Sequence, residues 1–209
     1  MALGKLEEQT IKAYDAQAAR WSGEHQSPGY WVKEMDRYQE FLPKGRILEV
    51  GSGGGRDAKE LRERGFDYVG TDASSGLVEQ ARKINPEAVF VHQNVYDLDF
   101  PENSFDGFWA SAVLLHIPKV RIDEALQKIH HVVKSQGVGF ISIKEGEGER
   151  MVTEDAQIGE MGFSRLFSFY SQSEFEGVLK RNGYEVEEFQ YRPISEKTKW
   201  LVFFIKVLK

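Results

Sequence analysis

The chain has 209 residues, of which 41% are hydrophobic and 29% charged, a composition typical of globular proteins. A chain of this length can bury about 70% of its unfolded surface, so it does not need disulfides to fold. It contains no cysteine, which excludes a disulfide framework, a thiolate zinc site and a cysteine nucleophile. The net charge of −6 disfavours nucleic acid as a partner, because nucleic-acid binding needs a basic surface.

No apolar run approaches the ~20 residues of a transmembrane helix, and the opening residues MALGKLEEQT contain no apolar export signal. We therefore expect a cytoplasmic protein that is a monomer or a homodimer. We expect neither a membrane partner nor a nucleic-acid partner, and no bound metal.

Residues 1–44 are polar and aromatic and predict an N-terminal helical cap. Between residues 45 and 145, short apolar runs alternate with stretches of helical spacing. The predicted strands are 47–50, 68–70, 88–92, 105–110 and 138–143, and the predicted helices end at Gly65, Pro86 and Gly137. Such alternation is typical of a doubly wound α/β fold with a parallel sheet.

The remainder of the chain has a different pattern. Residues 146–170 show no clear period and follow the fifth strand, so we expect a lid-like insertion at the ligand-binding edge. Within 171–209, a predicted helix at 173–182 precedes two strand-like runs at 184–191 and 199–208. With no helix between them, these runs predict a hairpin that adds an antiparallel strand to a mostly parallel sheet. The whole chain 1–209 is therefore expected to form one domain.

The first predicted strand leads into a glycine-rich turn, EVGSGGGRD at residues 49–57. Glycines at such a turn let the backbone approach a ligand closely. The dinucleotide fingerprint requires glycine at the sixth position, where this chain has Arg56. An acid, Asp72, ends the second strand 21 residues after Gly51, where a carboxylate can accept hydrogen bonds from both ribose hydroxyls. The turn and the acid together predict a nucleoside ligand.

Three segments carry a family resemblance: ILEVGSGGGRDA, VGTDAS and VHQNVYDLDFPENSFDGFWASAVLLHIP. In this order and spacing they resemble class I S-adenosylmethionine-dependent methyltransferases, in the small bacterial branch called type 11 or ubiquinone-biosynthesis-like. The resemblance covers about residues 45–145, the expected cofactor-binding core. It implies S-adenosylmethionine as the cofactor and a seven-stranded sheet whose last strand is antiparallel.

The resemblance also implies roles for residues of the glycine turn. Gly51, Gly53 and Gly55 would pass the methionine half of the cofactor, and Glu49 would reach its ammonium group through water. Ser52 and Arg56 belong to the same expected cofactor-binding turn. Two alternatives remain open: Glu49 could bond loop amides, and Arg56 could be a surface charge.

Further along the chain, the resemblance assigns Asp72 to the ribose and Ala73 to the adenine. Asn94 and Val95 follow the third strand, where the family usually has Asp and an apolar residue, so Asn94 is a departure. Ala110 and Ser111 would line the methionine and the sulfonium, and Tyr14 would cover the cofactor. Asp72 could instead serve only as a helix N-cap.

His116 follows the fourth strand, where the methyl acceptor is expected in this fold. A neutral imidazole there could accept a proton from the acceptor as a general base, or the residue could cap or bond a packed turn. We therefore expect methyl transfer to a small-molecule acceptor by in-line displacement. Two alternatives are a methyltransferase-like regulatory protein that binds the cofactor without turnover and a nicotinamide-dependent oxidoreductase.

Overall fold

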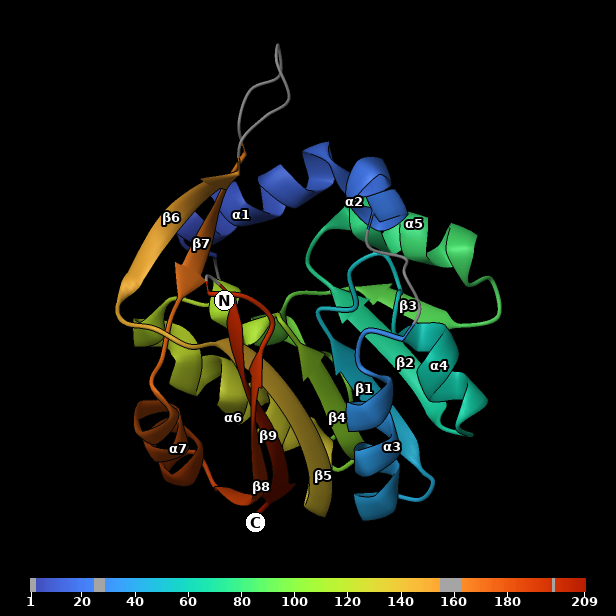
Figure 1. Cartoon of the computed structure of the whole chain (residues 1–209). Coiled ribbons are helices and arrows are strands. Elements are labelled where there is room, and N and C mark those ends of the chain that lie inside the picture. Colours follow the sequence, from blue (N-terminus) through green and yellow to red (C-terminus); the bar gives the residue numbers. More distant parts are fainter. Residues whose placement is uncertain (1–2, 25–28, 155–162, 197) are drawn as a thin grey trace.

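The computed structural model describes residues 3–24, 29–154, 163–196 and 198–209. Figure 1 shows a central sheet with helices on both faces and two further helices across one edge. The helices are α1 (Lys5–Ala16), α2 (Ala18–Glu24), α3 (Val32–Phe41), α4 (Ala58–Glu63), α5 (Ser75–Ile84), α6 (Ile122–Val132) and α7 (Gln172–Arg181). The strands are β1 (Arg46–Val50), β2 (Asp67–Asp72), β3 (Val89–His92), β4 (Phe105–Ser111), β5 (Val133–Lys144), β6 (Glu149–Glu154), β7 (Phe163–Ser168), β8 (Tyr184–Pro193) and β9 (Lys199–Val207). Short 3₁₀ turns span Val95–Asp97, Leu114–His116 and Lys119–Arg121.

The main sheet has seven strands in the order β3-β2-β1-β4-β5-β9-β8. Strands β1 to β5 pair in parallel, and β9 pairs antiparallel with both β5 and β8. This confirms the predicted mostly parallel, doubly wound sheet with an antiparallel strand from the C-terminal hairpin. The direction of winding changes at β1 and β4, and a doubly wound sheet binds its ligand at the carboxyl ends of the strands beside such a switch.

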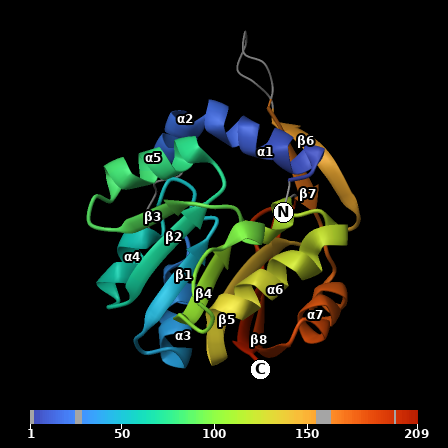
Figure 2. The ribbon, with the colours of Figure 1, turned by 180° about the vertical axis from the view of Figure 1, so that it is seen from behind.

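Alternating side chains of the strands build one hydrophobic cluster on each face of the sheet. Phe108 packs in the cluster shared with α6 and α7, whereas the next residue, Trp109, packs in the cluster shared with α3, α4 and α5. Trp109 stacks on Phe140 with ring centroids 3.6 Å apart. Figures 1 and 2 show these two helical layers from opposite sides. Successive strand residues point to opposite faces of the sheet. Because helices cover both faces, apolar residues are needed on both, and the strand sequences show little alternation of apolar and polar residues.

One predicted boundary is wrong. The helix that was expected to reach Gly137 ends at Val132, and β5 begins at Val133. Val133 pairs with Phe105, and the ladder shifts register before Gly107 pairs with Val138. Val133 continues the helical spacing set by Ile129, and it is buried in the strand as it would be in a helix. An apolar residue at this position therefore does not distinguish a helix from a strand.

Residues 146–170 are more regular than expected, since β6 and β7 form an antiparallel two-stranded sheet. The described strand β7 buries successive residues, Leu166 and Phe167, so the period of two that marks a half-exposed strand is missing. Residues 155–162 of this expected insertion lie outside the described residues. The helix α1 packs against β7 and α2 packs against α5, so both cross the carboxyl-end edge of the main sheet (Figure 1).

Candidate functional site

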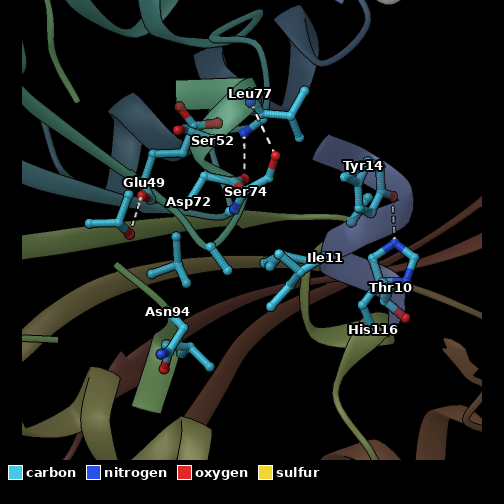
Figure 3. Close-up of a pocket in the computed structure, with 18 of the residues that line it drawn as sticks. Thr10, Ile11, Tyr14, Glu49, Ser52, Asp72, Ser74, Leu77, Asn94 and His116 are labelled. Carbon is cyan, nitrogen blue, oxygen red and sulfur yellow. Dashed lines mark hydrogen bonds between the residues drawn. The ribbon is translucent and has the colours of Figure 1, made fainter. Parts of the chain in front are cut away.

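A cavity of about 200 Å³ lies at the carboxyl ends of β1, β2, β3 and β4 and beneath α1. Figure 3 shows residues from the strand ends on one side of the cavity and the α1 residues Thr10, Ile11 and Tyr14 on another. The lining from the strand ends consists of residues 49–54, 56–57, 71–74, 93–96 and 111–113. Segments that are distant in the sequence therefore meet at the edge where the fold predicts a ligand.

The glycine turn after β1 is folded tightly against the end of β4. Gly51 has a φ of +70°, and a Cβ added there would lie 2.2 Å from Cγ2 of Val113. Gly53 also has a positive φ of +54°, and its missing Cβ faces open space. Glycine is therefore required at 51 by conformation and by packing, and at 53 by conformation only.

Asp72 ties this turn to the next strand end. One carboxylate oxygen accepts from the Gly53 amide and the other from the Ser74 amide, each at 2.8 Å. Burial raises the pKa of Asp72, and the two amide bonds partly oppose that effect. The N-cap of α5 is Ser74, whose Oγ accepts from the Leu77 amide. Asp72 thus lines the cavity as an anchor of the turn, and a different residue caps the helix.

Glu49 and Arg56 both line the cavity, each within a buried charge cluster. Glu49 is 2% exposed, and its hydrogen-bond donor is the Tyr68 hydroxyl, not a loop amide. Burial raises the pKa of Glu49 well above its usual value, and repulsion from Asp57 adds to the shift. Arg56 donates to both oxygens of Asp57, at 2.6 and 3.1 Å, which distinguishes it from a surface charge.

The ends of the four strands β1 to β4 bring most of the other expected cofactor residues to the cavity. Ala73, Asn94, Val95, Ser52 and Ser111 all reach it. Asn94 caps the 3₁₀ turn that follows it, because its Oδ1 accepts from the Tyr96 amide and its Nδ2 donates to Asp97, both at 2.9 Å.

Two expected cofactor residues, Ala110 and Gly55, do not line the cavity. Ala110 is fully buried in the hydrophobic cluster beneath α6, because it precedes Ser111 and so points to the opposite face of the strand. The carbonyl of Gly55 accepts from Asn85 at the end of α5, and a Cβ at this position would meet Asn85 and Phe90. Both residues therefore contribute to the packing of the protein and not to the lining of the cavity.

His116 is held between two elements. Its Nδ1 lies 2.6 Å from the Leu166 carbonyl of β7, which can only accept, so Nδ1 carries the proton. Nε2 therefore accepts from the Tyr14 hydroxyl, 2.8 Å away. Arg165 donates to the same hydroxyl at 2.8 Å. Burial lowers the pKa of His116 to about 3, and the nearby charges of Arg165 and Lys144 add to the effect. The imidazole is therefore neutral at physiological pH.

Several residues that line or support the cavity are not predicted by any pattern in the sequence. Glu7 of α1 is 4% exposed and accepts from Arg121 at 2.7 Å. Asp15 accepts from the Ser74 hydroxyl at 2.7 Å. Thr10 accepts from the Leu166 amide at 2.9 Å. Each bond joins α1 to a segment that is distant in the sequence, and such contacts leave no pattern in the sequence near either residue.

Within the described ranges, no group of three or more His, Asp or Glu residues is arranged to hold a metal ion. The same residues include no helix with the length and apolarity to cross a membrane.

Comparisons with known proteins show which family the chain is similar to. Residues 48–141 match the family model described as "Methyltransferase domain". A demethylmenaquinone methyltransferase of Beutenbergia cavernae is 24% identical over 149 residues, which cover 71% of this chain and 57% of that protein. In three curated relatives, the match covers 21%, 45% and 57% of the relative's own length.

Solved structures share the fold over the whole chain. The 1,6-didemethyltoxoflavin-N1-methyltransferase of Burkholderia thailandensis, with 1,6-didemethyltoxoflavin and S-adenosylhomocysteine bound, aligns with a TM-score of 0.76 at 20% identity, covering 100% of this chain and 93% of that one. The [4+2]-cyclase SpnF aligns with a TM-score of 0.75 at 16% identity, covering 100% and 98%. The family match, the order of the strands and the glycine turn lead to one conclusion: residues 48–141 are similar to the methyltransferase domain, and the chain has the fold of S-adenosylmethionine-dependent methyltransferases.

Proposed function

We propose that this chain binds S-adenosylmethionine and transfers its methyl group to a small-molecule acceptor by in-line displacement. The observation that carries the proposal is that a single cavity joins two kinds of site. Glu49 and Asp72 line it at the ends of β1 and β2, and Tyr14 and His116 line it beneath α1. A methyl donor and an acceptor need such adjoining sites, because the reacting atoms must be aligned before transfer.

The residues at the strand ends fit the cofactor. The Asp72 carboxylate retains lone pairs for the ribose hydroxyls beyond its two amide bonds. The buried hydroxyls of Ser52 and Ser111 line the cavity and have no hydrogen-bond partner among the described residues. Buried polar groups without a partner are costly, so these two favour a polar ligand that completes their bonds. Glu49 supplies a carboxylate for an ammonium group.

The acceptor side supports a small, partly apolar molecule. Ile11 of α1 and Val113 and Ile117 after β4 line the cavity together with Tyr14 and His116. The helix α1 is held over this region by bonds from Thr10 to β7 and from Asp15 to α5, which would exclude water from the reacting atoms.

The bound cofactor would supply a methyl group already activated by the sulfonium charge. The protein then mainly positions the acceptor, and alignment of this kind can lower a barrier by about 7–11 kcal/mol. The Tyr14 hydroxyl donates to His116 and accepts from Arg165, so these two residues fix its direction and leave its oxygen at most one further lone pair toward the acceptor. We assign Tyr14 to orienting the acceptor and His116 to fixing the direction of the Tyr14 hydroxyl.

Calorimetry with S-adenosylmethionine, S-adenosylhomocysteine and NAD tests the cofactor assignment. We expect binding of the two sulfur ligands and none of NAD, and the reverse result would reject the proposal. A screen of small metabolites for a mass gain of one methylene, together with release of S-adenosylhomocysteine, tests turnover. Binding without turnover across the screen would favour the alternative of a regulatory protein.

A further inference from the structure

One residue of β7 bonds to two elements of the acceptor side at once. The strands β6 and β7 form a two-stranded sheet, so within the described residues the outer edge of β7 is not paired with another strand. The Leu166 amide donates to Thr10 of α1 at 2.9 Å, and the Leu166 carbonyl accepts from His116 at 2.6 Å. In a strand the N–H and C=O of one residue point to the same side, so Leu166 can hold both partners on this edge.

The bond between Thr10 and Leu166 has a fixed direction. The Thr10 hydroxyl donates its proton to the Leu6 carbonyl, one turn earlier in α1, at 2.9 Å. The lone pairs of Oγ1 therefore remain for the Leu166 amide. Thr10 is 4% exposed and Leu166 is 1% exposed, so loss of the Thr10 oxygen would leave a buried amide without its acceptor.

The bonds of Leu166 complete a closed ring. Thr10 and Tyr14 are four residues apart and so lie on one face of α1 (Figure 3). Tyr14 donates to His116, and His116 donates to Leu166. The amide of the same Leu166 returns to Thr10. This hydrogen-bond ring joins α1, β7 and the turn after β4, and Arg165 donates to the Tyr14 hydroxyl beside it.

We propose that Thr10 is a positioning residue for methyl transfer. It fixes the backbone of Leu166, whose carbonyl fixes the His116 ring, and this ring in turn directs the Tyr14 hydroxyl toward the acceptor. Displacement of one member therefore displaces the group that meets the acceptor, and small misplacements of that kind slow a reaction strongly. The inference rests on the proposed function, since it concerns the same acceptor site.

NMR of the cofactor-free protein tests the hydrogen-bond ring without an acceptor. Thr10→Val keeps the branched shape and removes the hydroxyl. In this variant the Leu166 amide should exchange with solvent about 3- to 10-fold faster, the range of one neutral hydrogen bond. The Nδ1 signal of His116 should shift, whereas the signals of the other histidines should not. Thr10→Ser should keep both wild-type properties, because it retains the oxygen.

Thr153→Val is the matched control. Thr153 of β6 bonds to Ser164 of β7 at 2.6 Å, so the substitution removes a threonine hydroxyl from the same two-stranded sheet and leaves the ring intact. It should alter neither the Leu166 exchange nor the His116 signal. Thr10→Ala replaces Thr10→Val if the latter does not fold. A His116 signal that is unchanged in Thr10→Val, or that shifts equally in Thr153→Val, overturns the inference.

Kinetics with an acceptor from the metabolite screen test the consequence for turnover. Thr10→Val should lower kcat by about 3- to 10-fold at constant affinity for S-adenosylhomocysteine, and Thr10→Ser should restore the rate. In His116→Ala the ring is already broken, so adding Thr10→Val should lower kcat by less than about twofold. Equal losses in both backgrounds would show that Thr10 acts independently of His116 and would overturn the inference. Failure of the wild-type protein to bind S-adenosylhomocysteine rejects the proposed function instead, and the NMR comparison still decides whether the ring exists.

Discussion

The Tyr14 hydroxyl donates a hydrogen bond to Nε2 of His116, 2.8 Å away, and so joins α1 to the turn that follows β4. The opposite ring nitrogen of His116 is bound to the Leu166 carbonyl, which fixes the tautomer in which Nε2 accepts. A histidine held in this way can orient a neighbouring hydroxyl, and its low basicity makes it a weak proton acceptor.

We therefore predict that the kcat/KM of the wild-type enzyme shows no inflection near pH 6.5, where an unperturbed histidine titrates. The pKa of His116 is lowered to about 3, so the ring stays neutral through the neutral range. His116→Ala and Tyr14→Phe should each lower kcat by about 10- to 100-fold, since small misplacements of a substrate can cost on that order. Affinity for S-adenosylhomocysteine should change little.

His116→Asn separates positioning from proton transfer, because asparagine can accept from Tyr14 but cannot take up a proton. We expect this variant to be faster than His116→Ala. An inflection near pH 6.5 that is present in the wild-type protein and absent from His116→Asn would establish a general base instead. The depressed pKa also predicts that folding stability falls with acidification below about pH 6.5, where the unfolded chain binds a proton that the folded ring resists.

Asp72→Ala should weaken S-adenosylhomocysteine binding by at least about tenfold, because each charge-assisted hydrogen bond to the ribose contributes about 1.5–3 kcal/mol. The substitution also leaves the Gly53 and Ser74 amides without their acceptor, so the turn loses its anchor. Asp72→Asn keeps one acceptor oxygen and should lose less affinity. Calorimetry measures both effects, and a loss below about threefold in Asp72→Ala would show that the residue only shapes the turn.

Glu49→Gln should stabilise the cofactor-free protein at neutral pH while weakening cofactor binding. Because burial raises the pKa of Glu49 well above 4.5, the folded state binds this proton more tightly than the unfolded chain does. The wild-type fold therefore loses stability as pH rises from about 4.5 toward the folded-state pKa, because the unfolded chain releases a proton that the folded carboxyl retains. The difference in Tm between variant and wild type should grow over that range and shrink toward acid pH.

The same variant should lose about 10- to 100-fold in affinity for S-adenosylhomocysteine, since it cannot offer a negative charge to the ammonium group. Glu63→Gln, an exposed carboxylate on α4, is the control and should alter neither property. A Tm difference that does not change with pH would contradict the assignment of the shift to Glu49.

Gly51→Ala and Gly53→Ala separate packing from backbone conformation. Both residues have positive φ, which costs a residue with a Cβ about 1–2 kcal/mol. Only at Gly51 would the new methyl group overlap Val113, and overpacking of this kind adds about 1–3 kcal/mol. Urea unfolding should therefore rank Gly51→Ala as the less stable variant.

Adding Val113→Ala to Gly51→Ala should recover part of the loss, because it removes the methyl groups that the new Cβ would meet. The same change added to Gly53→Ala should bring no recovery. Equal free energies of unfolding for the two single variants would show that the contact with Val113 is unimportant.

The sequence by itself determined the architecture and the part of the cavity that lies at strand ends. The order of strands and helices predicts a parallel sheet, and a parallel sheet brings the carboxyl ends of its strands to one edge. The glycine turn follows β1 and Asp72 ends β2, so the meeting of the turn with this acid could be predicted from local patterns alone.

Only the tertiary structure decided how that edge is closed and which neighbours of the predicted residues face the ligand. His116 meets Tyr14 across 102 residues and Leu166 across 50, and no periodic pattern records contacts at such separations. The strand β7 that carries Leu166 is covered on both faces, so its alternation is hidden. Ala110 faces the core while Ser111 faces the cavity, and Asn94 is engaged in its own turn. These choices depend on strand register and on competing hydrogen bonds, which exist only once the chain is folded.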